Sequence, residues 1–127
     1  MTATKVKTVL AIDDEPQMLD ILKTILQEHG YNVLAARNEQ ESIQLYRQRW
    51  REIDVVLLDF MMPSMTGDQV LDRLKEINPR VTVLVVSGSA DAPRQTVLRG
   101  KGVRGFVHKP FRLDELVRQV NAVTGNP

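Results

Sequence analysis

Acidic side chains occur in this sequence directly after runs of apolar residues, where a carboxylate is costly to bury unless it has a partner. Asp13 and Asp14 follow one such run, and Asp59 follows another in "VVLLD". Ser87 and Lys109 follow two further short runs. Three carboxylates, one fixed positive charge and one hydroxyl donor are together the groups that can bind a divalent cation and a phosphoryl group.

Three carboxylates that share one pocket repel each other. Two unit charges about 4 Å apart interact by about 4 kcal/mol at an effective dielectric constant near 20, so such a pocket favours a bound cation or raised carboxyl pKa values. Mg²⁺ fits best, because it binds oxygen ligands, keeps several water molecules and shares phosphate oxygens. In such a phosphoryl site, the metal, Lys109 and Ser87 would contact the phosphoryl oxygens and a carboxylate would be the attacking group.

These side chains meet only if the apolar runs are strands of one sheet. Five short runs have the composition of strands: 8–12, 31–36, 54–58, 81–86 and 104–108. The first, third and fourth are almost continuously apolar, which is typical of strands that are buried on both faces. The second and fifth are more mixed, which suits strands at the edges of the sheet.

Segments with helical periodicity separate these strands. Apolar residues recur at helical spacing in 18–26, 43–50, 70–77 and 113–120. Pro16 and Gly30 mark the start and the end of the first helix, and Asn38 with Glu41 resembles a capping box at the start of the second. Residues 91–99 carry a weaker helical pattern with few large apolar residues.

Strand and helix therefore alternate five times, which predicts a parallel sheet that is covered by helices on both faces and has right-handed crossovers. The carboxyl ends of parallel strands lie at one edge of the sheet, where open α/β proteins bind their ligands. We therefore expect Asp13, Asp14, Asp59, Ser87 and Lys109 to converge at this edge, although they are far apart in the sequence.

The composition is that of a globular protein, and we expect residues 1–127 to form a single domain. Of the 127 residues, 43% are hydrophobic and 26% are charged, and the absence of cysteine excludes disulfides and thiolate metal sites. The net charge of +1, from 17 basic and 16 acidic residues, gives no indication of binding to nucleic acid or an anionic membrane. No apolar run approaches the roughly 20 residues that span a bilayer, so a cytoplasmic location is expected.

The sequence resembles a response-regulator receiver domain of two-component signalling, of the kind found in chemotaxis regulators, over essentially its whole length. Four motifs carry the resemblance in order and spacing: "DDE" at 13–15, "LLDFMMPSMTG" around Asp59, "VSGSA" around Ser87 and "FVHKPF" around Lys109. The resemblance implies a doubly wound, three-layer α/β/α fold with five helices. Its five-stranded parallel sheet would have the flavodoxin-like strand order 2-1-3-4-5.

The resemblance also implies roles for the acidic residues. Asp59 would accept a phosphoryl group from a sensor histidine kinase or a histidine phosphotransfer protein. Asp13 and Asp14 would bind Mg²⁺ together with Asp59 and the backbone carbonyl of Met61. The protein would then be a signalling receiver that assists its own phosphorylation and dephosphorylation, rather than an enzyme.

Further implied roles concern the response to phosphorylation. Ser87 and Lys109 would contact the phosphoryl oxygens, and a cis bond between Lys109 and Pro110 would direct the ammonium inward. Ser87 would move towards the new oxygens, and Phe106 would rotate into the vacated space as a switch residue. The face made by the fourth helix, the fifth strand and the fifth helix would transmit this change to a downstream effector or a second copy of the chain, with no direct binding to nucleic acid or membrane.

Simpler interpretations exist for each of these residues. Asp13 and Asp14 also suit the N-terminus of a helix, where the helix dipole favours acidic residues. Ser87 in "SGS" also suits a turn, and Phe106 is equally well interpreted as a core residue of an edge strand. The convergence of several motifs at strand ends favours the functional interpretation of the aspartates, Ser87 and Lys109.

Other functions fit the sequence less well. Aspartate-nucleophile phosphatases of the haloacid dehalogenase type resemble "DxDxT" after an apolar strand, whereas this sequence has "DFMMP" and lacks the second aspartate. A dinucleotide site would need a glycine-rich turn after the first strand, which instead carries "DDEP". The remaining alternative is a degenerate receiver that acts as a phosphorylation-independent interaction module. The output is open between a single-domain regulator or phosphorelay shuttle and a receiver within a longer regulator or hybrid kinase.

Overall fold

The structure is a computed structural model that describes residues 6–60, 66–88 and 92–125. Five strands alternate with five helices in this part of the chain. Their bounds are β1 (Thr8–Ile12), α1 (Pro16–Glu28), β2 (Asn32–Ala36), α2 (Glu39–Arg49), β3 (Val55–Asp59), α3 (Gly67–Ile77), β4 (Val83–Ser87), α4 (Ala92–Gly100), β5 (Val103–His108) and α5 (Leu113–Thr124). The alternation predicted from the apolar periodicity is confirmed, including the weak helix α4.

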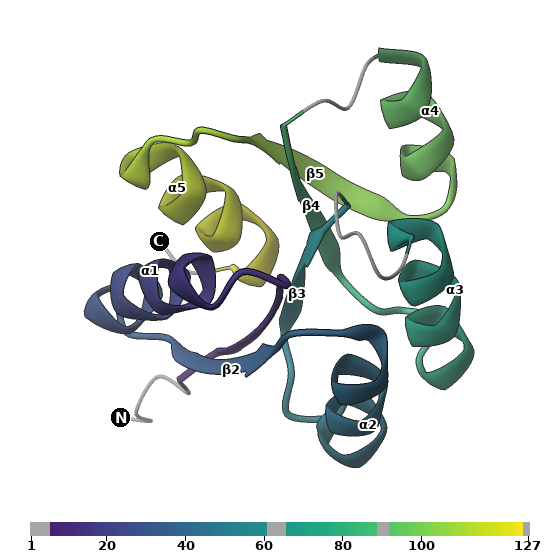
Figure 1. Ribbon diagram of the computed structural model, residues 1–127, viewed down its shortest axis with the longest axis horizontal. Helices are drawn as coiled ribbons and strands as arrows, with labels where there is room; N and C mark the ends of the chain where they lie inside the picture. Colours follow the sequence, from purple (N-terminus) through teal and green to yellow (C-terminus); the bar gives the residue numbers. More distant parts are fainter. Residues whose placement is uncertain (1–5, 61–65, 89–91, 126–127) are drawn as a thin grey trace.

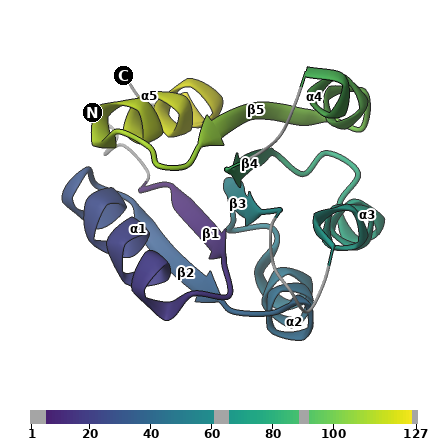
Figure 2. The same cartoon turned by 45° about the horizontal axis from the view of Figure 1, so that its top comes forward.

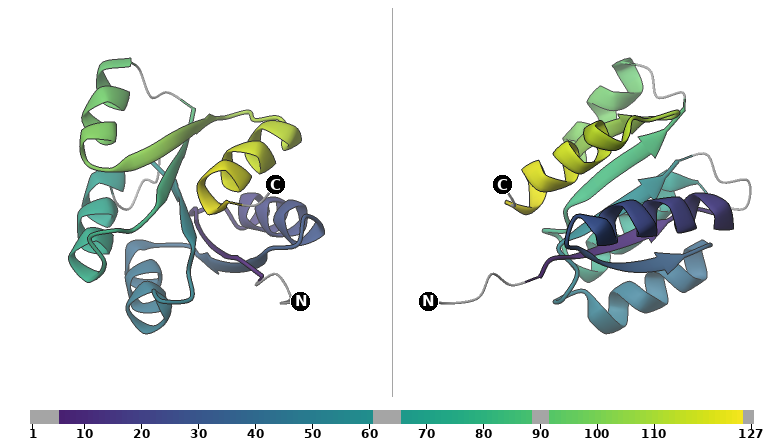
Figure 3. Two further views of the ribbon diagram at one scale, coloured as in Figure 1. Left: turned by 180° about the vertical axis from the view of Figure 1, so that it is seen from behind. Right: turned by 90° about the vertical axis from the view of Figure 1, so that its left-hand side faces the viewer.

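The strands form one sheet in the order β2-β1-β3-β4-β5, and all neighbouring pairs are parallel. This is the doubly wound, flavodoxin-like order 2-1-3-4-5 that the sequence resemblance implied, and β2 and β5 are the edge strands as predicted. The strands point the same way (Figure 3, right), so their carboxyl ends share one edge of the sheet.

Helices cover both faces of the sheet and complete a three-layer α/β/α fold. Helices α1 and α5 lie on one face, and α2, α3 and α4 lie on the other (Figures 1 and 2). Successive residues of a strand point to opposite faces, so Leu10 and Ile12 pack with α2, α3 and α4, whereas Val9 and Ala11 pack with α1 and α5. The central strands are buried on both sides, which explains their continuous apolar sequences.

The strand ends differ by one or two residues from the predicted ranges, and the difference bears on function. Asp59 is the last residue of β3 and Ser87 the last of β4, whereas the apolar pattern placed both just beyond the strands. Backbone pairing decides these boundaries, because Asp59 pairs with Val86 and Ser87 with His108. Both polar side chains therefore start from the rigid sheet rather than from a loop.

The predicted capping box of α2 forms in part. The side chain of Asn38 accepts a hydrogen bond from the backbone N–H of Glu41 at 2.8 Å, as in a capping box. The carboxylate of Glu41, however, accepts from the backbone N–H of Arg37 at 3.0 Å, one residue earlier than the box requires. The second hydrogen bond thus fixes the entry of the chain into the helix.

Helix α4 is attached to the domain by few apolar contacts. Leu98 is fully buried, whereas Val97 is 59% exposed, so one leucine provides most of the helix's large apolar contact within the described residues. None of the described helices combines the length and the apolar character that crossing a membrane would require.

Candidate functional site

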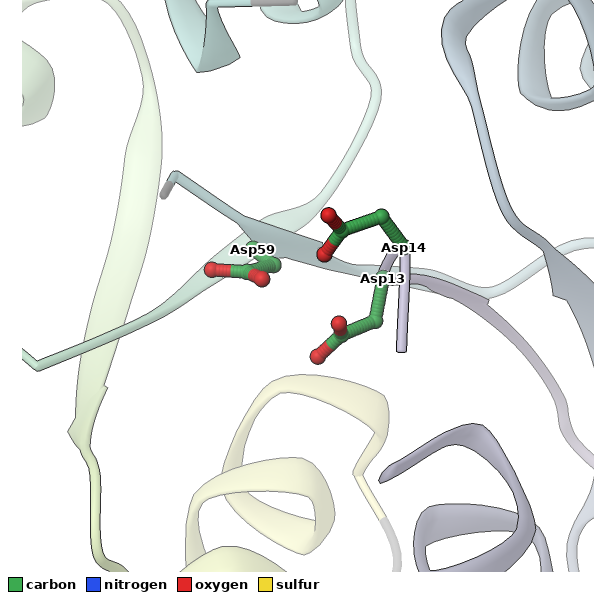
Figure 4. Close-up of side chains that lie close together, drawn as sticks. All are labelled: Asp13, Asp14 and Asp59. Atoms are coloured by element: carbon green, nitrogen blue, oxygen red, sulfur yellow. The ribbon is translucent and has the colours of Figure 1, made fainter. Parts of the chain in front are cut away.

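Strand register brings two aspartates side by side at the carboxyl edge of the sheet. Ile12 of β1 pairs with Leu58 of β3, so Asp13 and Asp59, the next residue of each segment, are lateral neighbours. Their side chains are only 1% and 3% exposed. The neighbouring Asp14 is half-buried. The convergence predicted for these three residues is therefore present (Figure 4).

Lys109 provides the positive charge for the two buried carboxylates. Its Nζ lies 3.0 Å from Oδ2 of Asp13 and 3.4 Å from Oδ2 of Asp59. The other carboxylate oxygen of Asp13 accepts the backbone N–H of Glu15 at 3.0 Å. The bond between Lys109 and Pro110 is cis, as predicted, and the ammonium faces the acidic residues.

The electrostatic environment acts on the protonation of Lys109. Burial lowers the pKa of the ammonium, but the hydrogen bond to Asp13 and the negative charges of Asp59 and Asp13 outweigh it, so the pKa of Lys109 stands above its usual value. Lys109 is therefore positively charged throughout the physiological pH range.

The three aspartates fit a divalent oxygen-binding cation. Each offers a carboxylate oxygen, and these oxygens all lie within 4.8 Å of one another. Close carboxylates of this kind are the ligands that Mg²⁺ prefers. One ammonium does not neutralise three carboxylates, so the cluster has the charge and the donor atoms to hold Mg²⁺.

Ser87 ends the strand next to Asp59. Its side chain is buried, at 4% exposure, and its carbonyl accepts the backbone N–H of Lys109 at 3.0 Å. That hydrogen bond joins the ends of β4 and β5 and so places Ser87 and Lys109 at the same edge as Asp59. Ser87 and Lys109 therefore lie at the predicted edge of the sheet, and the ammonium of Lys109 contacts the carboxylates.

The two remaining predicted site groups are the side chain of Phe106 and the backbone carbonyl of Met61. Phe106 is buried in the core between the sheet and helices α2, α3 and α4, and the guanidinium carbon of Arg99 lies 5.0 Å from its ring centroid. In this structure Phe106 is therefore a core residue of β5 that also contacts α4. The backbone carbonyl of Met61 lies outside the described residues.

A contact beside the site was not predicted from the sequence. A Cβ atom on Gly67 would lie 2.2 Å from the ring of Phe60, the residue after Asp59, so the ring requires a glycine at the start of α3. The guanidinium of Arg94 lies 5.5 Å from the Phe60 ring centroid and 2.5 Å from the Asp68 carboxylate. The glycine in "DFMMPSMTG" was the available signal, but a turn explained it equally well.

Comparison with known proteins identifies the family of this chain. The family model described as the response regulator receiver domain matches residues 9–121. The chain belongs to this family. It is a receiver domain of the response regulators of two-component signalling.

Individual relatives agree with this assignment. The receiver domain is 32% identical to a probable transcriptional regulatory protein, TcrX, of Mycobacterium tuberculosis, over 91% of this chain and 49% of that protein. It is 29% identical to the chemotaxis protein CheY of Thermotoga maritima, over 93% of this chain and 98% of that protein. The receiver domain therefore spans about half the length of the first relatives that it matches and nearly all of CheY.

Solved structures support the same fold. A response regulator receiver domain from Clostridium thermocellum superposes with a TM-score of 0.88 at 28% identity, covering 94% of this chain and 95% of that one. A CheX–CheY–BeF3–Mg+2 complex from Borrelia burgdorferi gives a TM-score of 0.87 at 26% identity, covering 92% and 88%.

The raised pKa of Lys109 leads to a prediction about stability. The substitution Lys109→Met leaves two buried carboxylates without their cation, so we expect the free energy of unfolding at neutral pH in EDTA to fall by up to about 3 kcal/mol. Because the folded pKa is raised, this stabilisation is complete below the unfolded value of 10.5 and is lost as the pH rises through the folded value. Urea unfolding of both proteins across this pH range measures the difference.

The matched control for this substitution is Lys23→Met, which removes an exposed lysine of α1. We expect it to leave the free energy of unfolding nearly unchanged at every pH. A Lys109→Met variant as stable as the wild type at neutral pH, or a difference that does not shrink as the pH rises above 10.5, would contradict the assigned ion pairs.

Proposed function

We propose that this receiver domain, as a single domain over residues 1–127, accepts a phosphoryl group on Asp59 from a phosphohistidine of a partner protein. The observation that carries the proposal is the ammonium of Lys109, which lies within 3.4 Å of both Asp13 and Asp59 in a cluster of three carboxylates. Such a cluster can hold one carboxylate as nucleophile while the other groups receive the charge of the phosphoryl oxygens.

Asp13, Asp14 and Asp59 would bind Mg²⁺, with the backbone carbonyl of Met61 as a further ligand. When bound, the metal supplies positive charge to the phosphoryl oxygens and reduces the repulsion between the incoming phosphate and the acidic cluster. The CheX–CheY complex from Borrelia burgdorferi was solved with Mg²⁺ and BeF3. This similar structure supports the proposal that the present receiver domain also binds Mg²⁺.

In the proposed reaction, an oxygen of the Asp59 carboxylate attacks phosphorus in line with the bond to the histidine nitrogen. The new O–P bond forms while the N–P bond breaks, and the electron pair of that bond returns to the imidazole. The position of Asp59 at the end of a rigid strand orients the attacking oxygen. Lys109 and the hydroxyl of Ser87 contact the phosphoryl oxygens.

The product is an acyl phosphate, a mixed anhydride that water can hydrolyse, so the signal is reversible. Phosphorylation replaces about one negative charge by about two and adds strong acceptor oxygens. These oxygens attract Ser87, and the resulting change at the end of β4 reaches Phe106 and the face made by α4, β5 and α5. The small apolar contact of α4 makes a local rearrangement there inexpensive.

The phosphohistidine partner would dock beside the site on helices α1 and α5. Ile21 and Leu113 are 47% and 58% exposed, and they line an apolar pocket of about 320 Å³ with Ile25. Helix α1 begins two residues after Asp14, and α5 begins four residues after Lys109, so this surface continues from the acidic site. An exposed apolar surface next to a reactive site suits a partner protein. The histidine kinase or phosphotransfer protein would therefore contact it.

The alternative of a degenerate receiver has less support. An interaction module without phosphorylation does not need three clustered carboxylates and a lysine among them, because burying such charges has a high energetic cost.

Phosphorylation at Asp59 can be tested directly. We expect Asp59→Asn to abolish Mg²⁺-dependent labelling by a small phosphodonor such as acetyl phosphate, because the amide is not a nucleophile for this reaction. The label on the wild type should be released by hydroxylamine, as from an acyl phosphate. Asp72→Asn, on the exposed side of α3, is the matched control and should label normally. Acid-stable labelling that persists in Asp59→Asn would exclude the assignment.

The role of Ser87 requires a readout of the switch. We expect Ser87→Ala to be phosphorylated but to show less than about half of the wild-type change in hydrogen exchange of α4 and β5 on phosphorylation, because the hydroxyl no longer draws the end of β4 towards the phosphate. Ser87→Thr keeps the hydroxyl and should restore the change. An unaltered exchange response in Ser87→Ala would remove this residue from the mechanism.

If the partner docks on α1 and α5, substitutions on this surface should slow phosphoryl transfer from a protein donor but not from a small phosphodonor. We expect Ile21→Gln with Leu113→Gln to slow transfer from a phosphohistidine protein by about tenfold or more, because apolar anchors are lost. Labelling by acetyl phosphate should be unchanged. Val97→Gln, which alters an equally exposed residue of α4, is the control. Equal rates for all three proteins with the protein donor would contradict the proposed surface.

A further inference from the structure

A second charged site lies at the other edge of the sheet, where strands β4 and β5 begin. It is a pocket of about 370 Å³ between α3, the loop that leads to β4, and the turn between α4 and β5. Four of its lining residues are basic, namely Lys75, Arg80, Lys101 and Arg104, and none of the described residues that line it is acidic. We call it the basic pocket. It is separate from the acidic site, because Asp59 lies at the opposite end of the strands.

The two lysines of the basic pocket are engaged with neighbouring groups. Nζ of Lys75 donates to the backbone carbonyl of Lys101 at 2.6 Å. Nζ of Lys101 lies 3.5 Å from the carboxylate of Asp68 and 3.4 Å from that of Asp72. These contacts hold the turn between α4 and β5 against α3, and they fix the shape of the pocket.

The two arginines differ from the lysines. Within the described part of the chain, no carboxylate forms an ion pair with the side chain of Arg80 or Arg104. Arg80 comes from the loop before β4, and Arg104 comes from β5. A guanidinium is planar and presents its N–H groups in a fork that matches two oxygens of a phosphate. Two such groups at one pocket therefore form a suitable anion site.

We propose that the basic pocket binds a small anion with several phosphate charges, such as the polyphosphate group of a nucleotide. Its volume lies in the range of small-molecule sites, and its positive charge attracts phosphate oxygens. Leu71 and Val81 form part of its wall, and no aromatic residue among those that the structure describes lines it, so its described wall offers no ring on which a base could stack. The phosphates, rather than a base, are the recognised group.

A structural role for the basic residues is the competing explanation. Helices α3 and α4 both end near the pocket, and a helix C-terminus carries about half a negative charge, which favours basic residues nearby. The hydrogen bond from Lys75 to the carbonyl of Lys101 is a contact of this type. Two helix ends offset only about one of the four positive charges. This explanation therefore accounts for Lys75 but not for both arginines.

A bound anion would also connect two parts of the fold. It would bridge Arg80, on the loop after α3, to Arg104 on β5, and thereby restrain the turn after α4. The binding itself does not depend on the phosphorylation of Asp59. The two proposals therefore fail independently.

The test measures binding of inorganic triphosphate by calorimetry and by amide chemical shifts at low salt. EDTA is present throughout, so that no metal–phosphate complex forms at the acidic site. We expect binding with shifts concentrated at residues 75–81 and 100–104, and weaker binding as salt is raised. Parallel titrations with ATP decide the source of the phosphates, since equal affinity indicates recognition of the phosphate chain alone and tighter binding of ATP indicates a nucleotide.

The decisive variant is Arg80→Gln with Arg104→Gln, which should weaken triphosphate binding by about tenfold or more, because each charged hydrogen-bonding group is lost. The matched control is Arg37→Gln with Arg47→Gln, which makes the same charge change at exposed positions outside the pocket and should bind as the wild type does. Amide spectra of both variants establish that they are folded. Absence of binding at millimolar triphosphate, or equal weakening in both variants, would overturn the proposal.

Discussion

The ammonium of Lys109 between two buried carboxylates is the interaction on which the carboxyl edge of the sheet depends. Asp13 and Asp59 are almost fully buried, and such charges are tolerated only when they are paired or bind a cation. Lys109 reaches them from the segment after β5, while the carboxylates come from the ends of β1 and β3. The two ion pairs of Lys109 therefore join three separate segments of the chain, and they require β1 and β3 to be adjacent in the sheet.

The two helical layers differ in how firmly apolar burial attaches them to the sheet. Helices α1 and α5 pack on one face through a continuous apolar cluster, and they present the exposed Ile21 and Leu113 beside the acidic site. On the other face, α4 depends on Leu98 and on polar contacts such as that between Arg94 and Asp68. Exposed ion pairs contribute little to stability. Among the described helices, α4 is thus the one whose position burial fixes least, which is compatible with the proposed response of this helix to phosphorylation.

Charge is separated along the strands, which the net charge of the chain conceals. Acidic groups cluster at the carboxyl edge, and basic groups surround the basic pocket at the amino edge. A net charge of +1 gave no indication of a broad surface for nucleic acid, and it could not reveal a local site. Opposite charges in two places cancel in the sum, although each place has its own electric field.

The sequence by itself determined the order of the elements, the edge and central strands, and the acidic set Asp13, Asp14 and Asp59, because periodicity and residue type report burial and chemistry directly. Motif resemblance added the strand order and the cis bond before Pro110. The tertiary structure alone decided the partner of each charge, the contact of Phe60 with Gly67, and the gathering of Arg80 and Arg104 at one pocket. Those features depend on distances between segments remote in sequence, and a local pattern carries no record of which remote side chains will meet.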